Sequence, residues 1–371
     1  MNTSPPDDFS GKTILVTGAC GTVGTELVRL LLSDATYKPA EVIGIDNDES
    51  GLFFIDQQYL DDARARFVVA DIRDKEKVVR IMRGVDVVFH TAALKHVVLC
   101  ERSPFEAVQT NIHGVRNIIH AAYEADVDRV IFTSSDKAVN PTNVMGTSKL
   151  MGERLMTAAN SNLRGEGPIF ASTRFGNVLG SNGSVVPIFH KQIAVGGPVT
   201  LTDPEMTRFI MSIEGAVRLV IDSASLALGG EVFVTKMPVV RIEDLAKAMI
   251  AELAGQYGHD PAAIQIKLIG SKPGEKLYEE LMSDEETRRS VELEQYFAVM
   301  PAFRGLYRQI DYAYEGTVST EVTNPYVSSV EPLLSQQEIS EVLRTHGLLN
   351  ELEDLEHAPD RRYWPGDKVE N

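Results

Sequence analysis

The stretch KTILVTGACGTVGTELVRLLL, residues 12–32, decides the fold of this chain. It begins with a short run of apolar and β-branched residues that ends in Gly18, and a helical pattern starts at Thr22. Gly18, Gly21 and Gly24 have the spacing GxxGxxG at the start of that helix. Glycines at these places let the chain turn tightly and let backbone N–H groups approach a pyrophosphate at the helix N-terminus. The stretch therefore predicts a strand, a phosphate-binding turn and a helix.

Outward from this stretch, apolar strands and helices continue to alternate. Strand patterns follow at 42–46, 66–71, 86–90, 129–135 and 169–173, and helical patterns at 106–125 and 144–160. Continuous apolar strands that alternate with helices are typical of a parallel sheet covered on both faces. The predicted fold class is therefore α/β, with a doubly wound parallel Rossmann sheet.

The alternation stops after the last of these strands. Loops rich in glycine and proline then separate shorter helices, one near Ser212 and one at 242–254. We expect three parts in the chain, which are a nucleotide-binding domain at 1–177, a smaller substrate-binding lobe interwoven with it at 178–330, and a loosely held, charged C-terminal extension at 331–371.

The composition limits the possible functions. Of the 371 residues 43% are hydrophobic, and 36 Lys+Arg against 53 Asp+Glu give a net charge of −17, which argues against a broad nucleic-acid-binding surface. Two cysteines, Cys20 and Cys100, cannot make a disulfide framework. The N-terminal residues lack the pattern of a signal peptide, and no apolar run approaches the roughly 18–20 residues of a membrane span. We expect a cytoplasmic protein with no membrane association and no metal site.

An acidic residue after the second strand supports a dinucleotide site. Asp46 ends that strand, where a carboxylate can accept hydrogen bonds from an adenosine ribose. The following residues, NDES at 47–50, offer no Lys or Arg for a 2′-phosphate, which favours NAD over NADP. Asp71 and Ile72 follow the third strand and are candidates to flank the adenine. The complete set of residues expected at the cofactor is Gly18, Cys20, Gly21, Thr22, Val23, Gly24, Asp46, Asp71, Ile72, Ala92, Ala93, Lys95, Asn111 and Lys149.

The segment HTAALKHV, residues 90–97, follows the fourth strand at the edge of the sheet where such folds bind ligands. Its small alanines let the chain run close to a dinucleotide, and Lys95 and His96 are candidates to bind a diphosphate. The alternative is an exposed basic pair on a loop. Asn111, in the helix at 106–125, is either a site residue or a surface amide.

The segment SSDKAVNPTNVMGTSK, residues 134–149, follows the fifth strand. It places Ser135, Asp136 and Lys137 at the same edge of the sheet. Met145 stands four residues before Lys149, so both side chains lie on one face of the predicted helix at 144–160.

Five blocks of sequence resemble the UDP-N-acetylglucosamine 4,6-dehydratases, which are extended short-chain dehydrogenase/reductases of bacterial polysaccharide and glycan biosynthesis. The blocks are HTAALKHV, SSDKAVNPTNVMGTSK, TRFGNVLGSNGSVVPIF (173–189), DPEMTRFIM (203–211) and KPGEKLYEELM (272–282). The resemblance runs from about residue 10 to 285. Short-chain dehydrogenases normally place a catalytic tyrosine four residues before the lysine, but one branch of this family has methionine there. This chain resembles the methionine branch without its membrane helices.

The resemblance implies a role for each residue after the fifth strand. Asp136 is the acid, Lys137 the base and Lys149 the lysine that binds the nicotinamide ribose. The implied reaction is oxidation at sugar C4, loss of water across C5 and C6, and return of the hydride to C6, which leaves NAD unchanged overall. Because Met145 cannot exchange a proton, the group that accepts the C4 hydroxyl proton stays open among Ser135, Asp136 and Lys137.

The resemblance also implies residues that bind a nucleotide-sugar substrate, with a UDP-sugar favoured. They are Lys95, His96, Asn177, Arg208, Lys272 and Glu275. Arg208 lies in the apolar sequence MTRFI, where a buried guanidinium needs an anion, which is either a phosphate or an internal carboxylate. Lys272 stands where the family often has arginine.

Three other functions stay open at this point. They are a nucleotide-sugar 4-epimerase of the same fold, a dehydratase of GDP-sugars, and an NAD-binding sensor without catalysis. The retained Asp136, Lys137 and Lys149 argue against the sensor, and an epimerase is expected to keep a tyrosine at position 145.

Extra apolar residues on two helices indicate a homo-oligomer built on dimers. They are Ile118, Ile119, Ala122, Leu150, Leu155 and Met156, more than packing on one sheet face needs. The alternative is that they lie under the second lobe.

Overall fold

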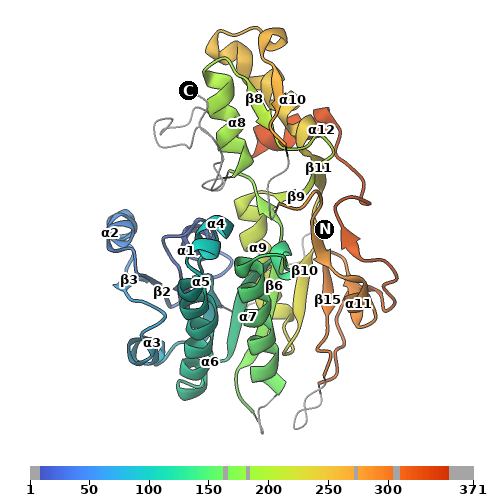
Figure 1. Cartoon of the computed structure of the whole chain (residues 1–371). Coiled ribbons are helices and arrows are strands. Elements are labelled where there is room, and N and C mark those ends of the chain that lie inside the picture. Colours follow the sequence, from blue (N-terminus) through green and yellow to red (C-terminus); the bar gives the residue numbers. More distant parts are fainter. Residues whose placement is uncertain (1–8, 162–165, 181–183, 271–274, 304–309, 351–371) are drawn as a thin grey trace. The chain divides into compact units, whose positions relative to one another are not determined.

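The computed structural model describes residues 9–161, 166–180, 184–270, 275–303 and 310–350 and divides into two units (Figure 1). The larger unit holds the described residues up to Phe175 together with Glu214–Lys236 and Leu281–Pro325. The smaller unit holds Gly176–Ile213, Met237–Glu280 and the described residues from Tyr326 onward.

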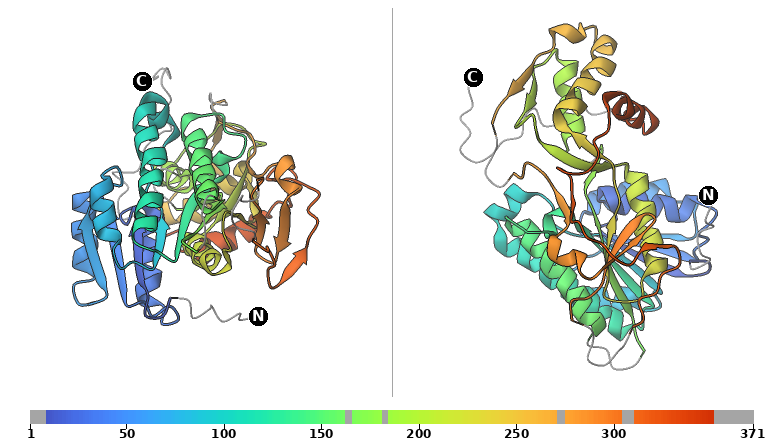
Figure 2. Two further views of the ribbon diagram at one scale, coloured as in Figure 1. Left: turned by 90° about the horizontal axis from the view of Figure 1, so that it is seen from below. Right: turned by 90° about the vertical axis from the view of Figure 1, so that its right-hand side faces the viewer.

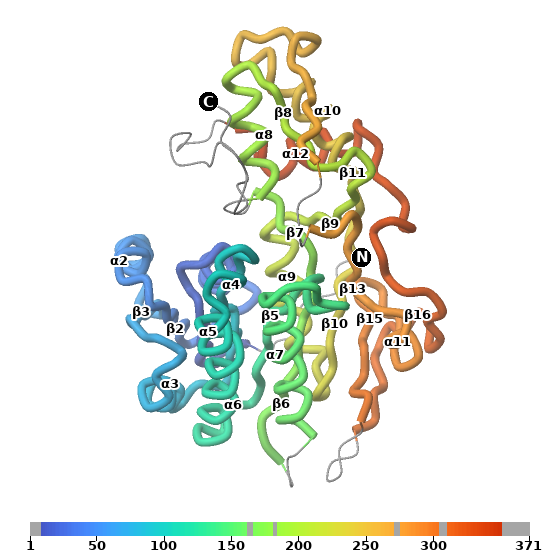
Figure 3. Tube along the Cα trace, viewed as in Figure 1, coloured from blue at the N-terminus to red at the C-terminus, as the bar shows by residue number. Residues whose placement is uncertain are grey.

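A ten-stranded sheet forms the centre of the larger unit. Its order is β3 (Ala65–Val69), β2 (Glu41–Asp46), β1 (Thr13–Thr17), β4 (Val87–His90), β5 (Arg129–Ser135), β6 (Ile169–Phe175), β10 (Val232–Thr235), β15 (Tyr296–Val299), β14 (Ser290–Leu293) and β16 (Thr317–Ser319). The strands from β3 to β10 are parallel, and the last three are antiparallel additions (Figure 3). The predicted doubly wound Rossmann sheet is confirmed, and its order reverses between β1 and β4, where such folds bind ligands.

Helices cover both faces of this sheet. Those of the larger unit are α1 (Thr22–Ser33), α2 (Glu49–Gln58), α3 (Lys75–Met82), α4 (Val97–Arg102), α5 (Pro104–Ala107), α6 (Val115–Glu124), α7 (Val144–Ser161), α9 (Ile213–Leu226) and α11 (Asp284–Thr287). The helices α3, α6 and α7 pack side by side on one face (Figure 2). Because β1 to β2 and β3 to β4 cross the sheet in opposite directions, α1 lies on the other face. There it is joined to α9 by the ion pair Asp34–Arg218.

The predicted helix at 106–125 is present, but it is not α-helical throughout. Between α5 and α6 the chain forms a π-helical segment, Val108–Gly114, which holds Asn111. A Cβ atom at Gly114 would lie 2.5 Å from Cδ1 of Ile72, so a glycine is needed where this segment meets the loop after β3. Widened turns of this kind are frequent at functional sites and have no strong sequence signature.

The smaller unit has its own hydrophobic core. Its elements are the three-stranded sheet β11 (Val239–Arg241), β9 (Thr207–Met211) and β7 (Asn177–Val178), the pair β12 (Ile266–Leu268) and β8 (Val199–Leu201), and the helices α8 (Val185–Ala194), α10 (Ile242–Leu253) and α12 (Gln336–Thr345). Phe189, Leu245 and Leu343 are among the buried residues that pack between these helices. The remaining short strands are β13 (Glu280–Met282) and β17 (Tyr326–Val327).

The unit boundaries differ from the predicted ones. The first boundary, expected at 177, follows Phe175, but the lobe expected at 178–330 is discontinuous. Residues 214–236 and 281–325 belong to the larger unit because β10, β14, β15 and β16 extend its sheet. The extension expected from 331 onward is also packed in part, since Leu343 of α12 is fully buried in the core of the smaller unit.

Five of the six apolar residues singled out on α6 and α7 have an explanation within the larger unit. Ile118, Ala122 and Met156 are buried in its core, and Ile119 and Leu155 pack against that core. They therefore do not indicate a dimer surface. Within the described residues, no helix is both long and apolar enough to cross a bilayer.

Candidate active site

In the glycine loop between β1 and α1 the backbone packs too closely against its neighbours to admit side chains. Gly18 has φ +73°, and a Cβ atom there would lie 2.8 Å from the backbone of Ala92. In the described chain Gly21 caps α1 without a side-chain hydrogen bond, which leaves the first-turn N–H groups of Thr22 and Val23 to an anion. Tight turns that end at a helix N-terminus in this way are suited to bind phosphate groups.

Asp46 is fixed beside this loop. Its carboxylate accepts hydrogen bonds from the backbone N–H groups of Cys20 at 3.0 Å and Asp48 at 3.1 Å. Burial and the nearby carboxylate of Asp46 raise the pKa of the Cys20 thiol to about 12, so the thiol stays protonated. Cys20 therefore adds no charge to the loop.

The pair expected to flank the adenine has two different environments. The Asp71 carboxylate makes an ion pair with Arg73 at 2.6 Å, and this contact lowers the pKa of Asp71. Ile72 is buried in the core of the larger unit, against Gly114. Asp71 is therefore held by its own neighbour in the chain.

The polar residues after β5 form a connected group. Ser135 donates its hydroxyl hydrogen to Oδ1 of Asp136 at 2.7 Å, and Nζ of Lys137 lies 3.1 Å from Oδ2 of the same carboxylate. Asp136 is buried, whereas the side chain of Lys137 is 33% exposed. One carboxylate thus links a hydroxyl and an ammonium at the carboxyl edge of the sheet.

Lys149 lies in the interior on α7. Its Nζ donates to the carbonyl oxygen of Thr133 at 3.0 Å and lies 4.7 Å from the centre of the Phe132 ring. Burial lowers the pKa of Lys149 to about 8. Met145 is also buried, where it contacts Cys100 and Ala107, so its thioether fills an apolar pocket.

Asn111 fixes the loop after β4. Its side chain accepts from Leu94 N–H at 2.8 Å and donates to the Leu94 carbonyl at 3.0 Å and to Oγ of Ser148 at 2.9 Å. The amide therefore joins the loop to α7 beside Lys149. In that loop Lys95 and His96 are exposed, and desolvation by nearby protein lowers both pKa values.

The candidate substrate residues of the smaller unit meet at one carboxylate. Glu279, which the sequence analysis did not single out, accepts from Nδ2 of Asn177 at 2.9 Å and lies 3.2 Å from Nε of Arg208. Arg208 also donates to the carbonyl oxygens of Thr207 and Lys276. The internal salt bridge considered for Arg208 is therefore present. Glu275 is half-buried, and Lys272 lies outside the described residues.

Arg174, which is fully buried, was also not predicted from the sequence. Arg174 of β6 donates from Nε and Nη2 to both oxygens of Glu153 at 2.7 and 2.6 Å, and from Nη1 and Nη2 to Glu286 at 2.9 Å each. The reasoning applied to Arg208 in MTRFI holds equally for Arg174 in IFASTRF. That signal in the sequence pointed to a buried anion, but not to which carboxylates supply it.

The sequence matches a known family along most of its length. A family model described as polysaccharide biosynthesis protein matches residues 14–301. The chain belongs to this family. Among its relatives, an inverting UDP-N-acetylglucosamine 4,6-dehydratase of Campylobacter jejuni is 39% identical over 306 residues, which is 82% of this chain and 87% of the relative.

Two further relatives span nearly the same length. An uncharacterized membrane protein of Methanocaldococcus jannaschii is 46% identical and covers 91% of this chain and 96% of its own. A UDP-glucose 4-epimerase of Rickettsia bellii is 37% identical over 90% of this chain and 96% of its own. The chain is thus a relative of nucleotide-sugar dehydratases and epimerases.

Solved structures confirm the fold of this family member. Pen from Bacillus thuringiensis has a TM-score of 0.82 at 37% identity and covers 92% of this chain and 99% of its own. The dTDP-glucose 4,6-dehydratase DesIV from Streptomyces venezuelae, solved with NAD bound, has a TM-score of 0.61 at 25% identity, over 71% of this chain and 86% of its own. The NAD in DesIV agrees with the cofactor predicted from the glycine loop and Asp46.

Proposed function

We propose that this protein is an NAD-dependent nucleotide-sugar 4,6-dehydratase that converts UDP-N-acetylglucosamine to a 4-keto-6-deoxy sugar nucleotide for surface glycan biosynthesis. The observation that carries the proposal is the group Ser135, Asp136 and Lys137, in which one buried carboxylate contacts both a hydroxyl and an ammonium. A dehydratase needs an acid and a base side by side, and Met145 supplies neither.

The larger unit fits NAD. The glycine loop and the first turn of α1 would hold the pyrophosphate, Asp46 the adenosine ribose and Lys149 the nicotinamide ribose. When bound, NAD would supply the hydride chemistry, taking a hydride from sugar C4 and giving it back at C6. The carboxylate of Asp46 disfavours the extra phosphate of NADP.

Proton transfer can be assigned to the group after β5. Ser135 donates to Asp136, so its oxygen can take the C4 hydroxyl proton while its own proton moves to Oδ1. Protonation of Asp136 removes the negative charge that holds the Lys137 ammonium, and Lys137 can then release a proton to solvent. Lys137 next takes the C5 proton as a neutral amine, and Asp136 gives its stored proton to the C6 hydroxyl, which leaves as water.

The smaller unit supplies a candidate site for the nucleotide sugar. Asn177, Arg208 and Glu279 form a joined polar group. Four of the five N–H bonds of Arg208 are directed to Glu279 or to the backbone carbonyls of Thr207, Lys276 and Leu277, which leaves one N–H of Nη2. We infer that Arg208 fixes the segment around Lys276 and leaves part of its guanidinium for a diphosphate. The basic residues Lys95, His96 and Lys272, together with Glu275, remain candidates for the same ligand.

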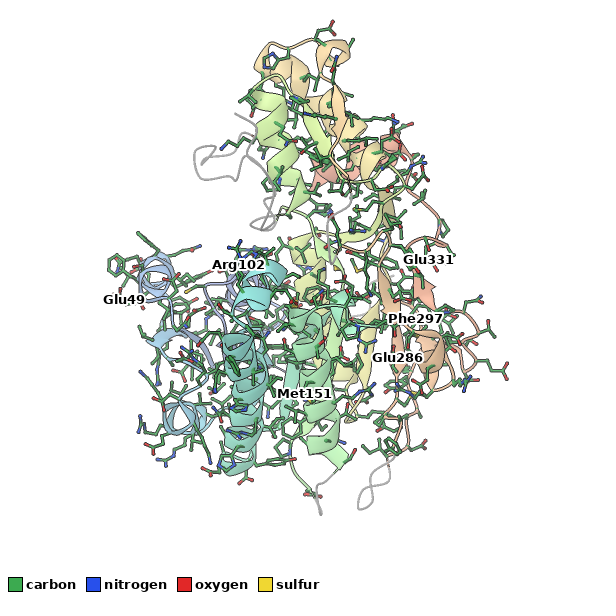
Figure 4. All side chains as sticks on the ribbon, in the orientation of Figure 1. Glu49, Arg102, Met151, Glu286, Phe297 and Glu331 are labelled. Atoms are coloured by element: carbon green, nitrogen blue, oxygen red, sulfur yellow. The ribbon has the colours of Figure 1, made fainter. Side chains whose placement is uncertain are left out.

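We also propose a homo-oligomer built on dimers, on different residues from those first considered. Leu99 of α4, Phe105 of α5 and Met151 of α7 are exposed by 58%, 80% and 46% (Figure 4 labels Met151). These helices pack against one another within the larger unit, so the three side chains lie on neighbouring elements. A monomer in light scattering at micromolar concentration contradicts this proposal.

A 4-epimerase is the second candidate, because UDP-glucose 4-epimerase is the name of the Rickettsia relative. Incubation with UDP-N-acetylglucosamine followed by mass spectrometry separates the candidates. Loss of one water is the result expected. An unchanged mass with a new stereoisomer indicates the epimerase, reaction with GDP-sugars alone a different substrate, and no reaction with any of them a sensor.

A further inference from the structure

A buried group of charges in the larger unit begins one helical turn after Lys149. It consists of Glu153, Arg174 and Glu286 and is here called the arginine cluster. Glu153 is four residues after Lys149 on α7, so the two side chains lie on one face of the helix, one turn apart. All three members of the cluster are buried. The cluster therefore places fixed charges in the interior beside a lysine that has no bulk water to solvate it.

The charges of the arginine cluster do not cancel. Two carboxylates share one guanidinium, and both Glu153 oxygens accept from Arg174 at 2.7 and 2.6 Å. The outer carboxylate, Glu286 on α11 (labelled in Figure 4), is 3.8 Å from a further cation, Arg289. The inner carboxylate, Glu153, lies one helical turn from Lys149, and the adjacent cation, Arg154, is exposed to solvent. Glu286 at one end of the cluster therefore faces Arg289, and Glu153 at the other end faces Lys149.

We propose that Glu153, held in place by Arg174, is a positioning residue that keeps the buried side chain of Lys149 cationic and directed at its ligand. This inference rests on the proposed function, in which Lys149 binds the nicotinamide ribose. Without Glu153, burial would drive Lys149 toward the neutral amine, which donates more weakly to ribose hydroxyls.

Other groups around Lys149 cannot replace Glu153. From β4, the neighbouring His90 is fully buried, and burial followed by the charge of Lys149 lowers the pKa of His90 to about 3. From β5 the contacts are the Thr133 carbonyl and the Phe132 ring. Among the described residues, Glu153 is the carboxylate that raises the pKa of Lys149 against desolvation.

Two matched variants test this inference. Glu153→Gln and Glu286→Gln each remove one carboxylate from Arg174, but only the first lies one helical turn from Lys149. The probe is the titration of Lys149 by NMR of the full chain with its NAD, labelled with ¹³C-lysine and assigned by the signal lost in Lys149→Arg. We expect the Lys149 midpoint to fall by about one pH unit in Glu153→Gln and to move much less in Glu286→Gln.

Two further results complete the test. Glu153→Asp keeps the charge and should keep the wild-type midpoint in a folded protein, which separates charge from packing. The alkaline limb of the kcat profile should move with the midpoint. Equal shifts in the two glutamine variants, or none in either, overturn the inference. Because the NMR titration needs no substrate turnover, failure of the dehydratase proposal leaves this test intact.

Discussion

Lys137 and Lys149 stand twelve residues apart and meet opposite electrostatic conditions. Lys137, after β5, is paired with the carboxylate of the residue before it, and its side chain is one-third exposed. Lys149, on α7, is buried over Phe132 and donates to a backbone carbonyl. The charge state of Lys137 depends on the adjacent residue Asp136, whereas that of Lys149 depends on its burial in the folded chain. A chemical role that needs proton exchange suits the first, and a fixed binding role suits the second.

Loss of Lys137, the partly exposed lysine, should give the largest effect on activity. We expect Lys137→Ala to lower kcat by about 10²–10⁴-fold and to abolish exchange of the C5 proton with solvent deuterium. Because C4 oxidation does not use Lys137 as its base, NADH should still form and accumulate. Mass spectrometry of the sugar in deuterated buffer and absorbance of NADH measure the two steps. Near-normal exchange in the folded variant would give the base role to another residue.

Among substitutions of buried residues, loss of Arg174 should lower the stability of the fold most. Arg174→Met leaves Glu153 and Glu286 buried without their cation, which should lower the free energy of unfolding by about 3–5 kcal/mol. Lys12→Met is the control, because the Lys12–Asp128 pair is exposed and should contribute about 1 kcal/mol or less. Urea denaturation compares the two variants. Equal losses would contradict the assignment of Arg174 to a buried charge cluster.

The same substitution should change the response to acid. Although burial opposes ionisation, Arg174 lowers the pKa of Glu286 from 4.5 to about 2. The stability from this pair is therefore present above pH 4.5 and is lost as the pH falls toward 2. In Arg174→Met this loss should vanish, so the variant should show a flatter dependence between these pH values.

Removal of the buried amine should have a smaller and opposite effect on stability. Lys149 has a pKa of about 8 in the folded chain against 10.5 ordinarily, so the unfolded chain binds more protons between these values. The cost of burying the ammonium is full below pH 8 and is relieved as the pH rises toward 10.5. Lys149→Met should therefore stabilise the protein without NAD by about 1–2 kcal/mol at pH 7 and by less at pH 10. Stabilisation that does not change with pH would assign the effect to packing alone.

The smallest effect is expected at Met145. This side chain packs against Cys100 and Ala107 and carries no proton for exchange, so Met145→Leu should change kcat only a few-fold. Met145→Tyr should leave activity unchanged or lower it, because a phenol must enter an apolar pocket. Steady-state kinetics of both variants test this. A large gain with tyrosine would show that position 145 is still the natural place for the base.

The sequence by itself determined the features that depend on near neighbours. The glycine loop, the Asp46 position and the order of strand and helix follow from local periodicity, so the Rossmann half was predicted to within a few residues. Ser135, Asp136 and Lys137 are adjacent, and their connection needed only the end of one strand. The family resemblance added the chemical roles, which no spacing of residues supplies.

The tertiary structure decided what depends on distant partners. Arg174 stands 21 and 112 residues from Glu153 and Glu286, and Glu279 is 102 residues from Asn177. A strand sequence shows that a buried arginine needs an anion, but only the folded sheet shows which carboxylate reaches it. The division of 178–330 between two units has the same cause. Strands join the edge of a sheet through backbone hydrogen bonds, and these depend little on the side chains that a sequence shows.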